Sequence, residues 1–289
     1  MPQEKVGVVG AGMMGAEIAL VFAMAGHDVL LADTGSAVVE AALARLAGVL
    51  DKGVERRFWT ADAAAAARRN LKPATSLAAY DDRDLVIEAV FEDAAVKGAL
   101  FRELDEICQP SCVFASNTST ISISTLAANV APARRGRFLG THFFSPVSRM
   151  KLVEVMPAFD TDAAVVERVT ALCREIGKVP VRIKDVPGFA VNRLLHAVFI
   201  EAVRLVEEGV ATPEDIDTAC RLGLGHPVGP FQLMDQVTNG LSLQVQEILQ
   251  DAYGERFRPR PLMKQMVRAG FDGRKAGRGW FRYETGKRG

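Results

Sequence analysis

Residues 1–184 alternate short apolar runs with longer amphipathic stretches. Short runs rich in β-branched and other apolar residues predict buried strands, and these fall at 6–9, 28–32, 85–89, 112–115, 137–141, 151–156 and 179–183. The intervening stretches predict helices at 16–25, 36–51, 60–70, 94–108 and 162–176. Such alternation is typical of a mostly parallel sheet covered by helices on both faces. The consecutive helices at 36–51 and 60–70 predict a helical hairpin inserted into this order.

The pattern changes at residues 185–188, Asp-Val-Pro-Gly, and beyond them we predict no strand. Apolar residues recur at helical spacing between 191 and 205, and Thr212 before Pro213 has the features of a helix start. Two more helices are predicted at 241–253 and 261–269, after a connector rich in glycine and proline. The sequence therefore predicts two domains, an α/β domain at 1–184 and an all-α domain at 185–289.

Charge and composition exclude several classes of protein. The chain carries 35 basic and 35 acidic residues, so its formal net charge is zero, and a chain without a net positive field is a poor candidate for binding nucleic acid. No apolar run approaches the roughly 18 residues of a membrane span. The residues before the first strand resemble no signal segment, so we expect a cytoplasmic protein. The four cysteines lack the spacing of a metal site, and we expect no metal.

A glycine-rich turn joins the first predicted strand to the first helix. Gly10, Gly12 and Gly15 have the spacing G-x-G-x-x-G inside a strand–helix–strand unit. This context predicts the dinucleotide site of a Rossmann-type domain: the first glycine makes the tight turn, the second lets the backbone approach the pyrophosphate, and the third packs helix on strand. The helix start at Met13 and Met14 would offer N–H groups to the phosphates.

The acidic residue Asp33 ends the strand that follows this first helix. A carboxylate at this place accepts hydrogen bonds from the ribose hydroxyls and repels a 2′-phosphate. The following residues, 34–36, supply no arginine to hold such a phosphate. The sequence therefore predicts NAD rather than NADP as the cofactor.

Three of the four histidines have structural interpretations, in a surface turn (His27), inside a helix (His196) and in the Gly/Pro connector (His226). His142 differs because it follows the predicted strand 137–141, at the edge of the sheet where open α/β sheets bind ligands. His142 is therefore the candidate catalytic histidine.

Oxidation of an alcohol by hydride transfer needs a base for the hydroxyl proton, and imidazole titrates near neutral pH. Glu154 lies inside the apolar strand that is predicted next after His142. A charged residue there is unusual unless it is paired, so we expect it to pair with His142. The residues alone leave open whether this pair is catalytic or a buried structural pair.

Several stretches together resemble the L-3-hydroxyacyl-CoA dehydrogenases, a family that includes the bacterial 3-hydroxybutyryl-CoA dehydrogenases. The matching stretches run in family order across nearly the whole chain: 10–15, 85–90, 115–119, 142–144, 150–155, 184–195, 209–217 and 222–230. The resemblance implies an enzyme that uses NAD to interconvert a 3-hydroxyacyl-CoA and its 3-keto form. It also implies the fold predicted above, with a hairpin that helps to hold CoA, and a homodimer formed through the second domain.

The resemblance also implies roles for individual residues. His142 corresponds to the family's general base and Glu154 to its partner. Ser119 resembles the serine that hydrogen-bonds the reacting oxygen and lies near the cofactor. Asn192 matches an asparagine that contacts the substrate from the second domain. These four residues are the expected catalytic set.

Glu92 and Lys97 match cofactor-side residues near the nicotinamide ribose, and Lys52 is a candidate CoA ligand on the helical hairpin. Ser145 departs from the family, which usually has a cofactor-contacting asparagine at this place. A serine side chain keeps a hydroxyl donor but is shorter than that of asparagine. A second departure is the polar segment 236–240, where the family is commonly more apolar.

Two other functions remain compatible with these residues. One is an NAD-dependent dehydrogenase of a free 3-hydroxy acid, since relatives of that kind share the glycines and the histidine. The other is a structural or binding protein that keeps the cofactor domain without activity. The intact set of Ser119, His142, Glu154 and Asn192 argues against this last possibility.

Overall fold

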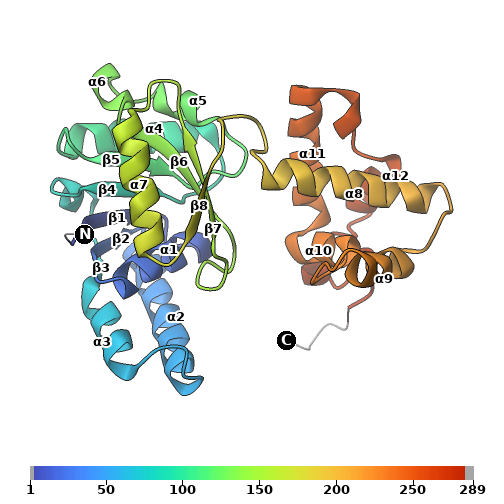
Figure 1. Ribbon diagram of the computed structural model, residues 1–289, viewed down its shortest axis with the longest axis horizontal. Helices are drawn as coiled ribbons and strands as arrows, with labels where there is room; N and C mark the ends of the chain where they lie inside the picture. Colours follow the sequence, from blue (N-terminus) through green and yellow to red (C-terminus); the bar gives the residue numbers. More distant parts are fainter. Residues whose placement is uncertain (1–2, 284–289) are drawn as a thin grey trace. The chain divides into compact units, whose positions relative to one another are not determined.

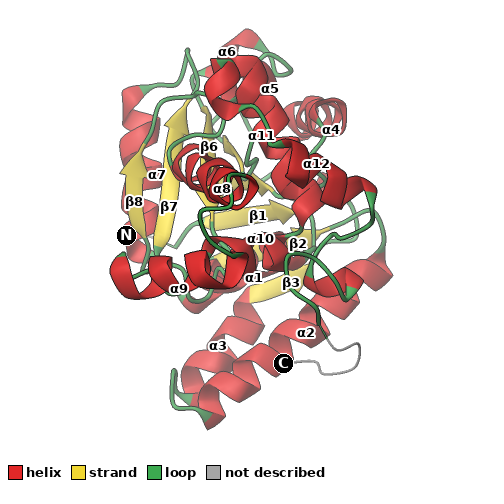
Figure 2. Cartoon of the chain, turned by 90° about the vertical axis from the view of Figure 1, so that its right-hand side faces the viewer, coloured by secondary structure: helices red, strands yellow, loops and turns green. Residues whose placement is uncertain are grey.

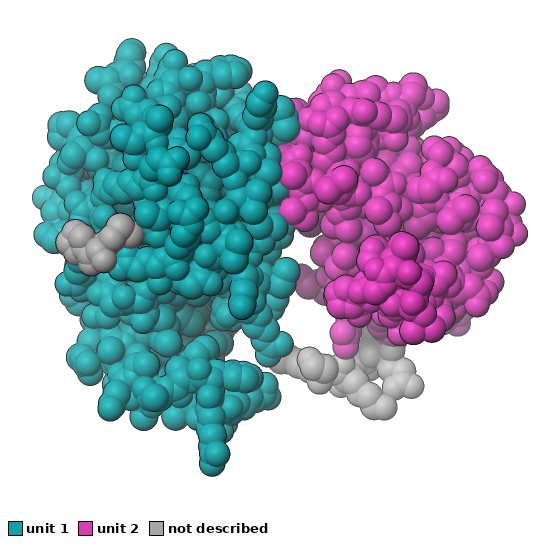
Figure 3. Space-filling model, viewed as in Figure 1, with its two compact units in different colours: residues 1–186 teal, residues 187–289 magenta. Residues whose placement is uncertain are grey.

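The computed structural model describes residues 3–283. The chain divides into two compact units, residues 1–186 and 187–289 (Figure 3). This division falls beside Lys184, where the change of sequence pattern places the domain boundary.

The first unit is built on one eight-stranded sheet with the order β3-β2-β1-β4-β5-β6-β7-β8 (Figure 1). Its strands are β1 (Lys5–Val9), β2 (Asp28–Ala32), β3 (Leu71–Pro73), β4 (Leu85–Glu88), β5 (Val113–Ser116), β6 (Phe138–Phe143), β7 (Leu152–Pro157) and β8 (Val179–Arg182). Every neighbouring pair is parallel except β6 and β7. The mostly parallel sheet predicted from the sequence is confirmed.

The helices of the first unit flank this sheet (Figure 1). They are α1 (Met13–Met24), α2 (Ser36–Glu55), α3 (Ala61–Asn70), α4 (Ala94–Ile107), α5 (Ile123–Ala127), α6 (Pro132–Arg135) and α7 (Ala163–Glu175), with a 3₁₀ turn at Leu77–Tyr80. Helices α2 and α3 lie side by side and form the predicted hairpin (Figures 1 and 2).

The order of the strands positions the cofactor site. After β1 the chain adds β2 on one side, and later β4 on the other side of β1. Ligands of open α/β sheets bind at such a point, where the order of strands reverses. The glycine-rich turn follows β1 directly, and Val6 and Val8 on that strand are fully buried and hold it in the core.

Three short elements of the first unit lack a clear sequence signal. Strand β3 has only three residues and contains Pro73, which a sheet tolerates because β3 lies at the edge. Helices α5 and α6 are short, and tertiary contacts hold their starts: just before α6, Asp105 accepts the N–H of Ala131. The carboxylate of Asp185 accepts hydrogen bonds from Ser122 Oγ and from the N–H groups of Ile123 and Ser124, at the start of α5.

The second unit is helical, with α8 (Val191–Glu207), α9 (Pro213–Gly223), α10 (Pro230–Val237), α11 (Asn239–Tyr253), α12 (Pro261–Arg268) and two 3₁₀ turns, Glu255–Phe257 and Arg274–Ala276. Within its described residues the only β contacts are isolated bridges between 273, 278 and 282. Helix α10 lies at the end of the expected connector. It forms because Pro230 takes the first helical position and buried Asp217 accepts the N–H groups of Phe231 and Gln232.

Two histidines outside the candidate site are buried. His27 was expected in a surface turn, but its ring is only 1% exposed and its Nδ1 accepts the N–H of Glu4. His196 lies inside α8 as predicted, and its Nδ1 has no hydrogen-bond partner among residues 3–283. Burial lowers the pKa of His196 to about 4.

We expect His196 to make the second unit sensitive to acid. Its folded pKa lies below its ordinary value of 6.5. Between about pH 6.5 and 4 the unfolded chain binds a proton at this residue more readily than the folded chain does. The free energy of unfolding is therefore unaffected above pH 6.5 and falls as the pH drops toward 4. Between pH 7 and 4.5, the loss in free energy of unfolding should be about 2–3 kcal/mol smaller in His196→Gln than in the wild type. Urea unfolding at both pH values measures this, with His226→Gln as the control. Equal losses in wild type and His196→Gln would contradict the assignment.

Candidate active site

The glycine-rich turn is packed so closely that two of its three glycines have no room for a side chain. Gly10 has φ +105°, and a Cβ there would lie 2.4 Å from the carbonyl oxygen of Ala89. A Cβ on Gly15 would lie 1.9 Å from the carbonyl oxygen of Gly10. A Cβ on Gly12 would meet nothing within 4 Å, so the space above this residue is open. The first and third glycines shape the turn, and the second leaves room for a ligand.

The start of α1 lies beside this open space, and among residues 3–283 no side chain caps it. Its N-cap residue is Gly12, which has no side chain to cap the N–H groups of Met13, Met14 and Gly15. A helix N-terminus without a cap suits a phosphate group. Ser145, just before a cis peptide bond to Pro146, places its Oγ 3.7 Å from Met13 Sδ. The predicted cofactor residues of the turn and Ser145 are therefore neighbours.

Asp33 lies at the end of β2, beside the turn. Its Oδ2 accepts the N–H of Ala11 at 2.6 Å, and its Oδ1 accepts the N–H of Thr34 at 2.7 Å. Arg45, in α2, donates from Nη2 to the carbonyl oxygen of Gly12 at 3.2 Å. The sequence did not indicate Arg45, because it lies well beyond Asp33 in the chain and reaches the turn only through the packing of α2. A dinucleotide fits this set of an open turn, an uncapped helix start and a carboxylate.

His142 and Glu154 form a pair across the antiparallel strands. His142 lies within β6, one residue before its end, whereas the sequence placed it after the strand. The register opposes His142 to Glu154 on β7, which puts both side chains on one face. The distance from Nδ1 to Glu154 Oε2 is 2.8 Å, and the side chains are 6% and 1% exposed. The predicted pairing is present.

The other ring nitrogen of His142 faces Ser119. Ser119 Oγ lies 3.1 Å from His142 Nε2. The loop after β5 carries Ser119, and Asn117 in the same loop accepts the N–H of Phe143 through Oδ1 at 2.9 Å. Asn117 thereby joins the carboxyl ends of β5 and β6. Asn117 was not among the predicted site residues, although it lies two residues before Ser119.

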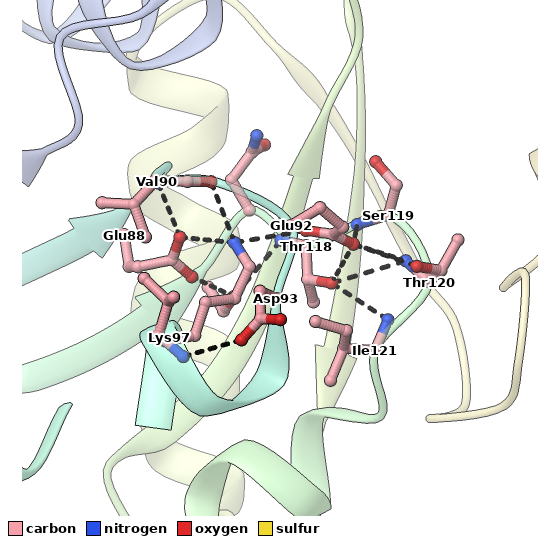
Figure 4. Close-up of polar contacts among 12 residues, drawn as sticks. Glu88, Val90, Glu92, Asp93, Lys97, Thr118, Ser119, Thr120 and Ile121 are labelled. Atoms are coloured by element: carbon pink, nitrogen blue, oxygen red, sulfur yellow. Dashed lines mark hydrogen bonds and ion pairs between the residues drawn. The ribbon is translucent and has the colours of Figure 1, made fainter. Parts of the chain in front are cut away.

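Glu92 and Lys97 also lie at this edge of the sheet (Figure 4). The side chain of Lys97 is only 1% exposed. Lys97 Nζ lies 3.2 Å from Glu92 Oε2 and 2.5 Å from Glu88 Oε1. Burial raises the pKa of Glu92, but Lys97 and the hydrogen bonds from Thr118, Ser119 and Thr120 outweigh it and hold the pKa below its ordinary value. Glu92 is therefore an ionised carboxylate next to Ser119.

The remaining two candidates lie elsewhere. Lys52, on α2, lines a cavity of about 820 Å³ together with Arg56, Phe58, Trp59 and Arg149. Asn192 belongs to the second unit and is the second residue of α8, which follows the backbone turn at Gly188 and Phe189. Among residues 3–283, no helix is long and apolar enough to cross a bilayer, and no group of three or more acidic, histidine or cysteine side chains could hold a metal ion.

Family models and known proteins match nearly the whole chain. The family model described as the NAD-binding domain of 3-hydroxyacyl-CoA dehydrogenase matches residues 5–186, and the model of the C-terminal domain of that enzyme matches residues 188–283. A probable 3-hydroxybutyryl-CoA dehydrogenase of Deinococcus radiodurans is 39% identical over 283 residues, covering 96% of this chain and all of that protein. A 3-hydroxybutyryl-CoA dehydrogenase of Mycobacterium tuberculosis is 41% identical, covering 97% and 98%.

The crystal structure of (S)-3-hydroxybutyryl-CoA dehydrogenase from Ralstonia eutropha is similar over 98% of this chain and 100% of that one, with a TM-score of 0.95 and 39% identity. These matches confirm an α/β cofactor domain followed by a helical domain, NAD as the cofactor and an oxidoreductase activity. The chain belongs to the 3-hydroxyacyl-CoA dehydrogenase family.

Proposed function

We propose that this protein oxidises a 3-hydroxyacyl-CoA to the 3-ketoacyl-CoA with NAD⁺, and catalyses the reverse reaction, with His142 as the general base. The observation that carries the proposal is the imidazole of His142, which lies 2.8 Å from a buried carboxylate at Nδ1 and 3.1 Å from a hydroxyl at Nε2. A base held between an anion and an alcohol side chain suits the removal of a hydroxyl proton.

Glu154 determines which nitrogen of His142 acts. A carboxylate is an acceptor, so the Nδ1 proton points toward Glu154 and Nε2 keeps its lone pair. Nε2 then accepts the proton of the 3-hydroxyl group, and Glu154 stabilises the imidazolium that results. When bound, NAD⁺ supplies the acceptor for the hydride from C3.

Ser119 and Asn192 complete the proposed catalytic set. The Ser119 hydroxyl is within hydrogen-bond reach of Nε2, so an oxygen that approaches Nε2 also approaches Ser119. We assign Ser119 to the reacting oxygen and Asn192 to a second oxygen of the substrate. Ser145 and the backbone of Met13 and Met14 complete the proposed cofactor contacts.

The cavity beside the helical hairpin suits the nucleotide part of CoA. Three cations, Lys52, Arg56 and Arg149, line it and can pair with phosphates. Phe58 is 66% exposed and Trp59 adjoins it, which offers aromatic surface to an adenine ring. We therefore propose Lys52 as one CoA ligand among these cations.

We also propose a homodimer formed through the second unit. Its surface carries several large apolar side chains that are more than half exposed: Leu194, Val210, Leu222, Leu224 and Leu241. Large apolar side chains left this exposed in one chain are the kind that a partner subunit covers. Sedimentation at micromolar concentration tests this, and a monomer would contradict it.

We also propose that the protein is cytoplasmic. The cysteines Cys108, Cys112, Cys173 and Cys220 are free thiols, and free thiols fit a reducing compartment. Fractionation of cells that express the protein would test it.

Oxidation of NADH with acetoacetyl-CoA, followed by a series of longer acyl-CoA substrates, tests the activity directly. Free acetoacetate and NADPH are the controls. We expect kcat/KM for the thioester to exceed that for the free acid by about 100-fold or more, because contacts to CoA contribute binding energy to the transition state. Equal rates with the free acid would favour a dehydrogenase of free 3-hydroxy acids. No turnover with either would indicate a silent relative, and better turnover with NADPH would refute the role of Asp33.

A further inference from the structure

Glu88 is a buried acid to which the proposed mechanism gives no role. It is the last residue of β4 and is fully buried. Its Oε1 accepts Lys97 Nζ at 2.5 Å and the N–H of Val90 at 2.7 Å, and its Oε2 accepts Ser116 Oγ at 2.6 Å. Burial holds the pKa of Glu88 above its ordinary value, and these partners reduce that rise without cancelling it. All three partners are donors, so the pocket suits the ionised carboxylate.

Lys97 joins Glu88 to Glu92. Its ammonium contacts both carboxylates, at 2.5 and 3.2 Å, and also the carbonyl oxygen of Val90 at 3.3 Å (Figure 4). The side chain of Lys97 is 1% exposed, so water does not reach its ammonium group easily. Loss of either carboxylate would leave a buried charge without its partner, which is strongly destabilising. The position of Lys97 therefore depends on Glu88 on one side and on Glu92 on the other.

Glu92 in turn holds the loop that follows β5. Its Oε1 accepts Thr118 Oγ1 at 2.6 Å, Ser119 N–H at 2.8 Å, and the N–H and Oγ1 of Thr120 at 3.0 and 3.1 Å (Figure 4). One carboxylate oxygen thus binds three consecutive residues. The middle residue is Ser119, whose hydroxyl lies 3.1 Å from His142 Nε2.

We propose that Glu88 is a positioning residue that acts on the reaction through Ser119. Glu88 fixes Lys97, Lys97 fixes Glu92, and Glu92 holds the Ser119 backbone so that its hydroxyl faces His142. This inference rests on the proposed function and adds to the cofactor-side roles expected for Glu92 and Lys97. Displacing a catalytic group by about 1 Å can cost about 100-fold in rate, so loss of Glu88 should affect turnover more than cofactor affinity.

The test is a double-mutant cycle between Glu88→Gln and Ser119→Ala in the full chain. Glu88→Gln keeps the shape of the side chain but removes its charge. We expect it to lower kcat for acetoacetyl-CoA by about 10- to 100-fold in the wild type, and by less than about 3-fold in the Ser119→Ala background, where the positioned hydroxyl is absent. The NADH dissociation constant, measured by fluorescence, should change by a smaller factor than kcat, because the reacting hydroxyl of Ser119 depends on the loop position more steeply than cofactor binding does.

Asp105→Asn is the matched control, because Asp105 pairs with buried Arg134 in the same unit, at 2.8 Å. It should lower the melting temperature while kcat stays within about 3-fold of the wild-type value. If Glu88→Gln does not fold, Ser116→Ala removes one hydrogen bond from Glu88 and one from the N–H of Thr118, and leaves every charge in place. It should lower kcat less than Glu88→Gln would, with the same dependence on Ser119.

Equal losses of kcat in both backgrounds, or a loss that appears mainly in NADH affinity, would overturn the inference. These outcomes differ from failure of the proposed function, which would appear as absent turnover in the wild type. An active wild type with an inactive His142→Gln variant and an additive cycle would therefore refute only the positioning role of Glu88.

Discussion

Replacing His142 with glutamine is expected to lower kcat for acetoacetyl-CoA reduction by about 100- to 10,000-fold. Glutamine keeps a polar side chain of similar length but cannot take up or release a proton near neutral pH. The NADH dissociation constant should stay within about 3-fold of the wild-type value, because His142 lies on β6 and contacts Glu154 and Ser119 rather than the glycine-rich turn.

Steady-state kinetics with saturating NADH and fluorescence titration of the cofactor measure the two quantities separately. His226→Gln is the control variant, since His226 lies in the Gly/Pro connector and its backbone N–H bonds Cys220. It should keep kcat within about 2-fold of the wild-type value. Turnover of His142→Gln near the wild-type rate would refute the general-base assignment.

Replacing Gly15 with alanine is expected to raise the NADH dissociation constant by about 100-fold or more and to destabilise the first unit by about 3 kcal/mol. The added Cβ would lie 1.9 Å from the Gly10 carbonyl oxygen and 3.2 Å from Ala89 Cβ. The turn cannot easily move away from the added Cβ, because the N–H of Gly10 donates a hydrogen bond to the carbonyl oxygen of Ala32 at the end of β2. The clash must therefore displace the turn that forms the cofactor site.

Two further alanine variants separate a loss of NADH affinity from a loss of stability. Gly48, on α2, has nothing within 4 Å of an added Cβ, so Gly48→Ala should stabilise the protein by roughly 0.5–1 kcal/mol and leave NADH binding unchanged. Gly12→Ala also meets nothing in the structure, so it should lower NADH affinity while the melting temperature stays close to wild type. If Gly15→Ala binds NADH like the wild type, the turn does not form the cofactor site.

Much of the fold could be predicted because the spacing of apolar residues within a segment shows whether that segment is a buried strand or an amphipathic helix. Buried parallel strands such as β1 and β4 are short continuous apolar runs, and a glycine at φ > 0 or in close contact has few substitutes. Elements whose ends depend on distant residues were missed or misplaced. Helix α10 needs Asp217 from α9, and the end of β6 was underestimated because its last residues pair with β7.

For the candidate site, too, the residue types could be predicted from the sequence, but their contacts could not. Its residue types were readable from the chain, because a base, an acid and a serine in family order have recognisable motifs. Their partners depend on register and strand order. The β6–β7 register opposes His142 to Glu154, and the packing of α2 brings Arg45 to the glycine-rich turn.

The sequence by itself determined the α/β and helical parts, the dinucleotide turn and the choice of NAD, since each depends on residues close together in the chain. Only the tertiary structure decided that buried Glu88 and Lys97 form one cluster with Glu92 behind Ser119. The physical reason is that a charge is tolerated in the core only when its partners are in place, and those partners come from β4, α4 and the loop after β5.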